Sequence, residues 1–178
     1  MKPERILTVE ASHSLNFLLY VHNYAKQEKH CYPYIPGNPW NLQEQSILRP
    51  LLQQLWNETL ADSTYPSLPI DYQKERFRSL FCDEISFEYC LDTFYSWWGS
   101  MAGSMAIERF VDQDSHNSLY TLFLLTNKEH LTINLLYEND ILGSPVVDNQ
   151  LVLTLRETFV REEMITTMQD RLTLNGNK

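Results

Sequence analysis

Apolar residues recur at helical spacing through the first 112 residues of the chain, and this periodicity is the strongest constraint on its fold. The clearest stripe follows the i, i+3, i+4, i+7, i+8 pattern of one helix face and consists of Leu48, Leu51, Leu52, Leu55 and Trp56. Residues 12–28 begin with serines suited to capping, and residues 86–111 carry further apolar residues at helical spacing. We therefore expect helices over most of residues 12–112. The expected core includes Leu52, Leu55, Trp56, Leu91 and Phe94.

The remainder of the chain predicts strands and a closing helix. Residues 119–126 and 130–138 are apolar segments separated by a short polar turn, which favours a β-hairpin, and residues 150–156 favour a third strand. The tail is expected to form an amphipathic helix, because apolar residues recur there at i+4 steps: Val160, Met164, Met168 and Leu172. Residues 5–10 fit either a short strand or an extension of the first helix.

These patterns predict an α+β fold in a single globular domain spanning residues 1–178. Its N-terminal two-thirds would be helical, followed by a small antiparallel sheet of about three strands and a C-terminal amphipathic helix.

Charge and cysteine content narrow the classes of function. Twenty-three acidic residues against fourteen basic ones give a net charge of -9, which argues against direct binding to nucleic acid or to an anionic membrane. The N-terminus lacks the apolar stretch of a secretory signal. The three cysteines have no CxxC spacing, so we expect reduced thiols in a cytoplasmic protein.

The sequence contains no recognisable catalytic or ligand-binding motif. Gly99 and Gly103 lack the lysine of a phosphate-binding loop. Residues 112–117 begin like a calcium loop, but Asn117 and Phe123 stand where such a loop needs glycine and glutamate. The five histidines form no cluster with metal-ligand spacing. We therefore predict no catalytic residue, no metal site and no cofactor.

The most informative signal is the placement of acidic residues. Between residues 83 and 114, seven acids against Arg109 give a net charge of -6, which leaves -3 for the other 146 residues. Glu88 and Asp92 are four residues apart, so on a helix they share a face. A solvated, solubilising surface explains such a run, and so does a docking surface for a basic partner. The predicted docking residues are Asp83, Glu84, Glu88, Asp92, Asp112 and Asp114, with Tyr95 or Trp97 as exposed aromatic anchors.

Three hypotheses of function follow. The first is a small acidic protein-binding module that neutralises or regulates a basic partner, such as a toxin or a nucleic-acid enzyme, in the manner of an immunity protein, antitoxin or inhibitor. The second is a small-molecule-binding protein or small enzyme whose cavity is lined by the aromatic residues of segment 31–40. The third is a subunit of a homo-oligomer, such as a homodimer.

Overall fold

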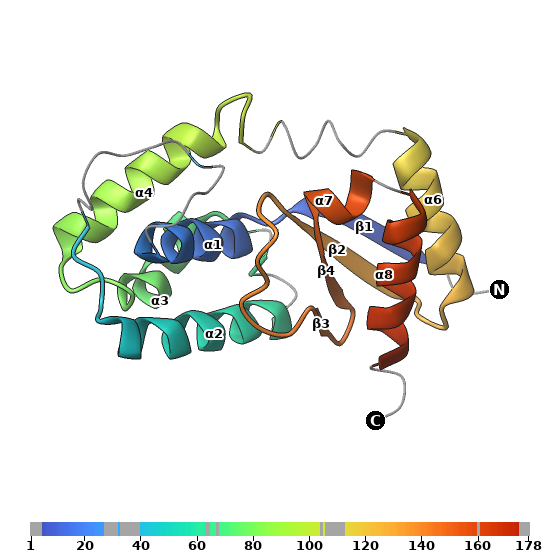
Figure 1. Ribbon diagram of the computed structural model, residues 1–178, viewed down its shortest axis with the longest axis horizontal. Helices are drawn as coiled ribbons and strands as arrows, with labels where there is room; N and C mark the ends of the chain where they lie inside the picture. The colour runs from blue at the N-terminus through green and yellow to red at the C-terminus, as the bar shows by residue number, and fades with distance from the viewer. Residues whose placement is uncertain are drawn as a thin grey trace.

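The computed structural model describes residues 5–26, 32, 40–62, 65, 66, 68–103, 105, 113–159 and 161–174. Its helices are α1 (His13–Lys26), α2 (Gln45–Ala61), the 3₁₀ helix η1 (Ile70–Gln73), α3 (Lys74–Arg78), α4 (Glu84–Trp98), α6 (Gln113–Leu125), α7 (Leu155–Phe159) and α8 (Arg161–Leu174). Its strands are β1 (Ile6–Ala11), β2 (His130–Leu136), β3 (Val146–Val147) and β4 (Gln150–Thr154). Figure 1 shows α1 to α4 at one end of the molecule and the sheet with α6, α7 and α8 at the other.

The helices expected from the apolar periodicity are present in the N-terminal part of the chain. α1, α2 and α4 all lie within the predicted range 12–112. Ser12 caps α1, because its Oγ accepts a hydrogen bond from the amide of Leu15. The predicted core is confirmed, since every one of its members is at most 4% exposed: Leu52, Leu55, Trp56, Leu91 and Phe94.

Large aromatic side chains fill the space between α1 and α4. The ring of Phe94 lies 5.2 Å from that of Phe17 and 5.4 Å from that of Tyr20, in edge-to-face geometry. The indole of Trp98 stacks on Phe94 with ring centroids 5.5 Å apart. Such pairs add to the stabilisation that burial of apolar surface already provides.

The predicted antiparallel sheet is wrong. The sheet has the strand order β1-β2-β4-β3, and β2 pairs in parallel with both β1 and β4. Ile133 of β2 lies opposite Val9 on one side and Leu151 on the other. Among the strands that the structure describes, antiparallel pairing is confined to β3 and β4. The ambiguous residues 5–10 fall mostly within β1.

The hairpin prediction fails because residues 119–126 are helical almost throughout. Leu119, Leu122 and Phe123 are buried on one face of α6, whereas Leu125 is 74% exposed. A short apolar run without strict alternation does not distinguish a buried strand from a buried helix. β4 is buried along its whole length, which is typical of a strand in a parallel sheet that is covered on both faces.

The closing helix is present, and it packs beside the sheet. Met164 and Met168 of α8 are buried, as the i+4 spacing predicts, while Val160 lies outside the described residues. Arg171 of α8 donates a hydrogen bond to the Val152 carbonyl of β4 and forms an ion pair with Glu157. Within the described ranges, no helix combines the length and the apolar character needed to cross a bilayer.

Candidate functional site

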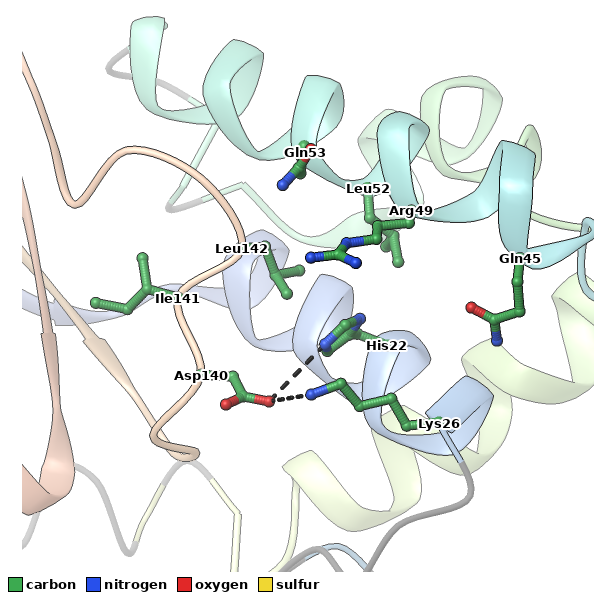
Figure 2. Close-up of a pocket in the computed structure, with 9 residues that line it drawn as sticks. All are labelled: His22, Lys26, Gln45, Arg49, Leu52, Gln53, Asp140, Ile141 and Leu142. Atoms are coloured by element: carbon green, nitrogen blue, oxygen red, sulfur yellow. Dashed lines mark hydrogen bonds and ion pairs between the residues drawn. The ribbon is translucent and has the colours of Figure 1, made fainter.

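A pocket of about 350 Å³ lies between α1, α2 and the loop that follows β2 (Figure 2). Its lining residues are His22 and Lys26 from α1, Gln45, Arg49, Leu52 and Gln53 from α2, and Asp140, Ile141 and Leu142 from the loop. The polar residues of each helix are four positions apart, so each helix presents one face to the pocket.

The charged groups of the pocket come from all three segments. The carboxylate of Asp140 lies 2.9 Å from Nζ of Lys26 and 3.8 Å from Nε2 of His22. Arg49 is exposed and forms no ion pair with a residue that the structure describes. Figure 2 shows its guanidinium turned towards Leu142 and His22. Two permanent cations therefore face one carboxylate in a protein whose net charge is -9.

The loop wall of the pocket is fixed by hydrogen bonds to α2. The indole Nε1 of Trp56 donates to the Ser144 carbonyl over 2.9 Å, and the Ser144 amide donates to Oδ1 of Asn57 over 3.1 Å. Gly143 lies so close to α2 that a Cβ atom there would stand 2.6 Å from Oδ1 of Asn57. These contacts hold residues 143 and 144, which directly follow the lining residues 140–142, against α2.

Sequence reasoning missed this pocket. Its residues come from three segments that are distant in the chain, and no segment alone resembles a ligand-binding motif. The available signal was the i, i+4 spacing of His22 with Lys26 and of Arg49 with Gln53.

Three of the predicted acidic residues, Asp83, Glu84 and Glu88, form contacts within the protein. Asp83 is the N-cap of α4, where its carboxylate accepts hydrogen bonds from the Ser86 amide at 2.7 Å and from Nδ2 of Asn41 at 3.0 Å. The bond from the backbone amide is the main cause that lowers the pKa of Asp83. This carboxylate stabilises the helix start, whatever else it binds.

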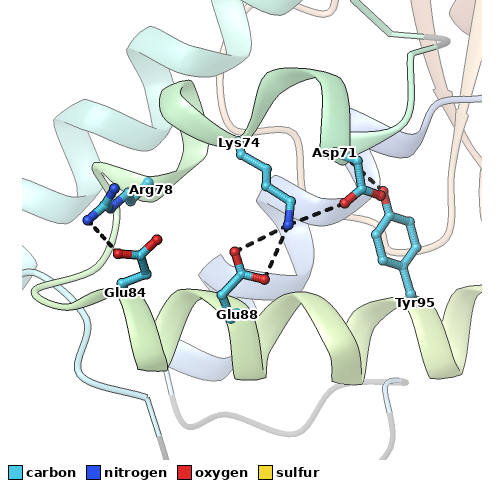
Figure 3. A network of polar contacts seen from close by, with 6 residues as sticks. All are labelled: Asp71, Lys74, Arg78, Glu84, Glu88 and Tyr95. Atoms are coloured by element: carbon cyan, nitrogen blue, oxygen red, sulfur yellow. Dashed lines mark hydrogen bonds and ion pairs between the residues drawn. The ribbon is translucent and has the colours of Figure 1, made fainter.

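Two further carboxylates on α4 form ion pairs with the preceding helix (Figure 3). Glu84 lies 2.9 Å from Arg78, and Glu88 lies 3.2 Å from Nζ of Lys74. Lys74 also approaches Asp71 at 3.4 Å, and its hydrogen bond to Glu88 raises the Lys74 pKa. Basic residues of α3 therefore neutralise part of the acidic surface of α4, which the charge count along the sequence did not show.

The remaining acidic candidates differ in position. Asp92 is exposed on α4 and has no ion pair with any described residue. Asp112 lies outside the described residues. Asp114 belongs to α6, which Figure 1 places at the opposite end of the molecule from α4. The fold therefore does not bring Asp114 to the α4 surface.

The expected aromatic anchors are not exposed. Trp97 is 5% exposed and packs edge-to-face on Tyr32 and Tyr137, so the prediction of an exposed anchor there is wrong. Tyr95 is half-buried, and its hydroxyl accepts a hydrogen bond from the Asp71 amide at 3.3 Å. Burial is the main cause that raises the pKa of Tyr95 to about 12.

Other side chains provide the apolar surface on the outside of α4. Ile85 is 83% exposed and Tyr89 is 47% exposed. They lie at i, i+4 and i+7 spacing with Asp92, so the three residues form one stripe, which we call the α4 stripe. The sequence contained the signal for it, because a helix that buries Phe87, Leu91 and Phe94 must turn these positions outward.

The hypothesis of an aromatic-lined cavity finds no support in the described part of segment 31–40. Trp40 is 3% exposed, and its ring lies 4.6 Å from that of Tyr24. Tyr32 is 4% exposed and packs on Tyr20. Residues 33–39 lie outside the described residues, and the pocket of Figure 2 has no Phe, Tyr or Trp in its lining.

Within the described ranges, no group of three or more His, Cys, Asp or Glu side chains is arranged to hold a metal ion. The chain matches no protein-family model, no curated protein and no solved structure.

Proposed function

We propose that this protein is a small protein-binding module that docks a basic partner protein on the α4 stripe, in the manner of an immunity protein, antitoxin or inhibitor. The observation that carries the proposal is the exposure of Ile85 and Tyr89 beside the Asp92 carboxylate, which forms no ion pair with a residue that the structure describes. The proposed apolar contacts are therefore Ile85 and Tyr89, which face the solvent, and not Tyr95 and Trp97.

The composition of the stripe supports this proposal. When a partner covers exposed isoleucine and tyrosine side chains, the removal of their apolar surface from water stabilises the complex. Tyrosine is among the residues enriched at the energetically important centres of interfaces. A carboxylate at the rim favours a partner with lysine or arginine, and it contributes more to the association rate than to the final affinity.

The occupant that fits is a segment of a basic protein that presents an apolar side chain flanked by lysine or arginine. The net charge of -9 supports this choice, because it attracts a basic protein over a long range and repels a second copy of this chain. The proposal includes a cytoplasmic location, which the free thiols of Cys82 and Cys90 favour.

The test uses a defined probe, a labelled amphipathic helical peptide of leucine and lysine, titrated into ¹⁵N-labelled protein. We expect the largest chemical-shift changes at Ile85, Tyr89 and Asp92. The double variant Ile85→Ser/Tyr89→Ala should weaken binding by at least about tenfold without lowering the melting temperature. Ile47→Ser is the matched control, because Ile47 is 52% exposed on α2.

The charge is tested separately by Asp92→Lys, since Glu88→Lys would also break the ion pair with Lys74. This variant should slow peptide association at low salt, and the difference should shrink as salt is raised. Shift changes spread evenly over all acidic surfaces, or equal binding by the double variant and the Ile47→Ser control, would contradict the proposal. So would equal binding of a leucine and glutamate peptide.

A further inference from the structure

We infer that the pocket between α1, α2 and the loop after β2 is a binding site for the oxyanion group of a small molecule, a carboxylate or a phosphate. Arg49 is the principal contact, and Lys26 is the second. This site is separate from the α4 stripe, and it does not depend on the proposed function.

The first argument is the charge balance inside the pocket. Lys26 is paired with Asp140 at 2.9 Å, whereas Arg49 forms no ion pair with a described residue. A guanidinium presents a rigid fork of donors that matches carboxylate and phosphate oxygens. The pocket therefore has an excess cation, although acidic residues outnumber basic ones in the chain.

The second argument is that a carboxylate of the protein itself, that of Asp140, already lies beside the basic groups of the pocket. The Asp140 carboxylate lies between Lys26 and His22, and its side chain is 47% exposed (Figure 2). Half-exposed side chains can change rotamer at little cost, so an incoming oxyanion can displace Asp140 from Lys26 and bridge Lys26 and Arg49. Asp140 would then compete with the ligand.

The third argument is shape. A volume of about 350 Å³ lies at the lower end of the range for small-molecule pockets. Leu52, Ile141 and Leu142 provide an apolar wall, while Gln45 and Gln53 add amide groups. The hydrogen bond that Trp56 donates to the Ser144 carbonyl and the one that the Ser144 amide donates to Asn57 hold the loop, so binding costs little conformational entropy of the loop.

The test is a titration of the full chain with inorganic phosphate and, separately, with acetate, at constant ionic strength. Chemical shifts of ¹⁵N-labelled protein report binding, and the two probes distinguish phosphate from carboxylate recognition. We expect saturable shifts centred on residues 49 and 140–142 with at least one probe. Arg49→Gln should weaken binding by about tenfold or more.

Two further variants complete the test. Asp140→Asn should strengthen binding, because it removes the competing carboxylate, and a merely structural role for Asp140 would not have that effect. Arg156→Gln is the matched control, because Arg156 is also exposed but lies on α7, outside the pocket lining. Shifts that grow without saturation with both probes, or equal affinity in Arg49→Gln and Arg156→Gln, would overturn the inference.

Discussion

The helical region around α4 and the sheet region around β2 both bury large apolar side chains, but of different kinds. The helical region is packed with aromatic rings, such as those of Phe17, Tyr20 and Phe94. The sheet is filled mainly with aliphatic residues, such as Ile133 and Leu151, which are both fully buried. A helix satisfies its own backbone hydrogen bonds, whereas a strand needs a partner strand. The helical region thus depends on side-chain packing, and the sheet also depends on contacts between distant parts of the chain.

Asn16 of α1 joins the two regions. Its side-chain amide donates to the carbonyls of Ser12 and Leu135, and its Oδ1 accepts a hydrogen bond from the Tyr137 amide. Leu135 belongs to β2 and lies 119 positions along the chain from Asn16. One buried amide therefore fixes the position of α1 relative to the end of β2.

The largest effect is expected from Phe94→Ala, which tests whether ring packing holds the helical region together. Phe94 is fully buried, so its truncation should lower the free energy of unfolding by about 3–5 kcal/mol. Urea unfolding measures the change, and Phe94→Leu should lose less because it leaves a smaller cavity. Equal stability of Phe94→Ala and the unmodified protein would show that the rings do not carry this region.

A smaller decrease in the free energy of unfolding is expected from Asn16→Leu, which removes the hydrogen bonds of Asn16 between the two regions. The substitution leaves the buried Leu135 carbonyl without this partner, which costs about 1–3 kcal/mol, and the part-buried Tyr137 amide also loses its acceptor. Hydrogen exchange should show that the Tyr137 amide loses its protection. The amides within α4 should still exchange only through global unfolding. Retained protection at Tyr137 together with unchanged stability would mean that the regions are joined by other contacts.

The smallest effect is a pH dependence at His13, which lies in the helical region. Nε2 of His13 accepts a hydrogen bond from Nε1 of Trp98 at 2.9 Å, and burial lowers the His13 pKa below its usual 6.5. The His13 side chain therefore binds a proton less readily in the folded protein than in the unfolded chain. The stability that His13 contributes is present above pH 6.5 and is lost as pH falls through its lowered folded-state pKa.

Thermal melts between neutral and mildly acidic pH measure this dependence. His13→Asn should flatten the profile, and His130→Asn is the matched control because His130 is an exposed histidine of β2. An identical slope in His13→Asn would show that other groups cause the acid sensitivity.

Much of the helical region was predictable, because its signals are local. The spacing of Leu52, Leu55 and Trp56 marks a helix face wherever that helix packs. The same reasoning, applied to the outer face of α4, would have pointed to Ile85 and Tyr89. Acidic charge alone points to Glu88 and Asp92 instead, because a charge count does not show which neighbouring positions on the helix are buried.

The sheet and the pocket were not predictable in this way. Residues 119–125 belong to α6, a helix that has a buried face and packs against α8, and no local alternation in the sequence records that contact. The pairing of β1 with β2 joins segments more than 100 residues apart, so the strand at residues 6–11 has no partner near it in sequence. The neutralisation of Glu84 and Glu88 likewise depends on α3, which the fold places opposite them.

The sequence by itself determined the helices of the N-terminal region, core residues such as Leu52 and Phe94, and the acidic character of the chain, because periodicity and charge are properties of neighbouring residues. The tertiary structure decided the direction of the strands, the burial of Trp97 and the assembly of Arg49, Lys26 and Asp140 around one pocket. These features require distant segments to meet, and hydrogen bonding between strands or ion pairing between helices is fixed only when they do.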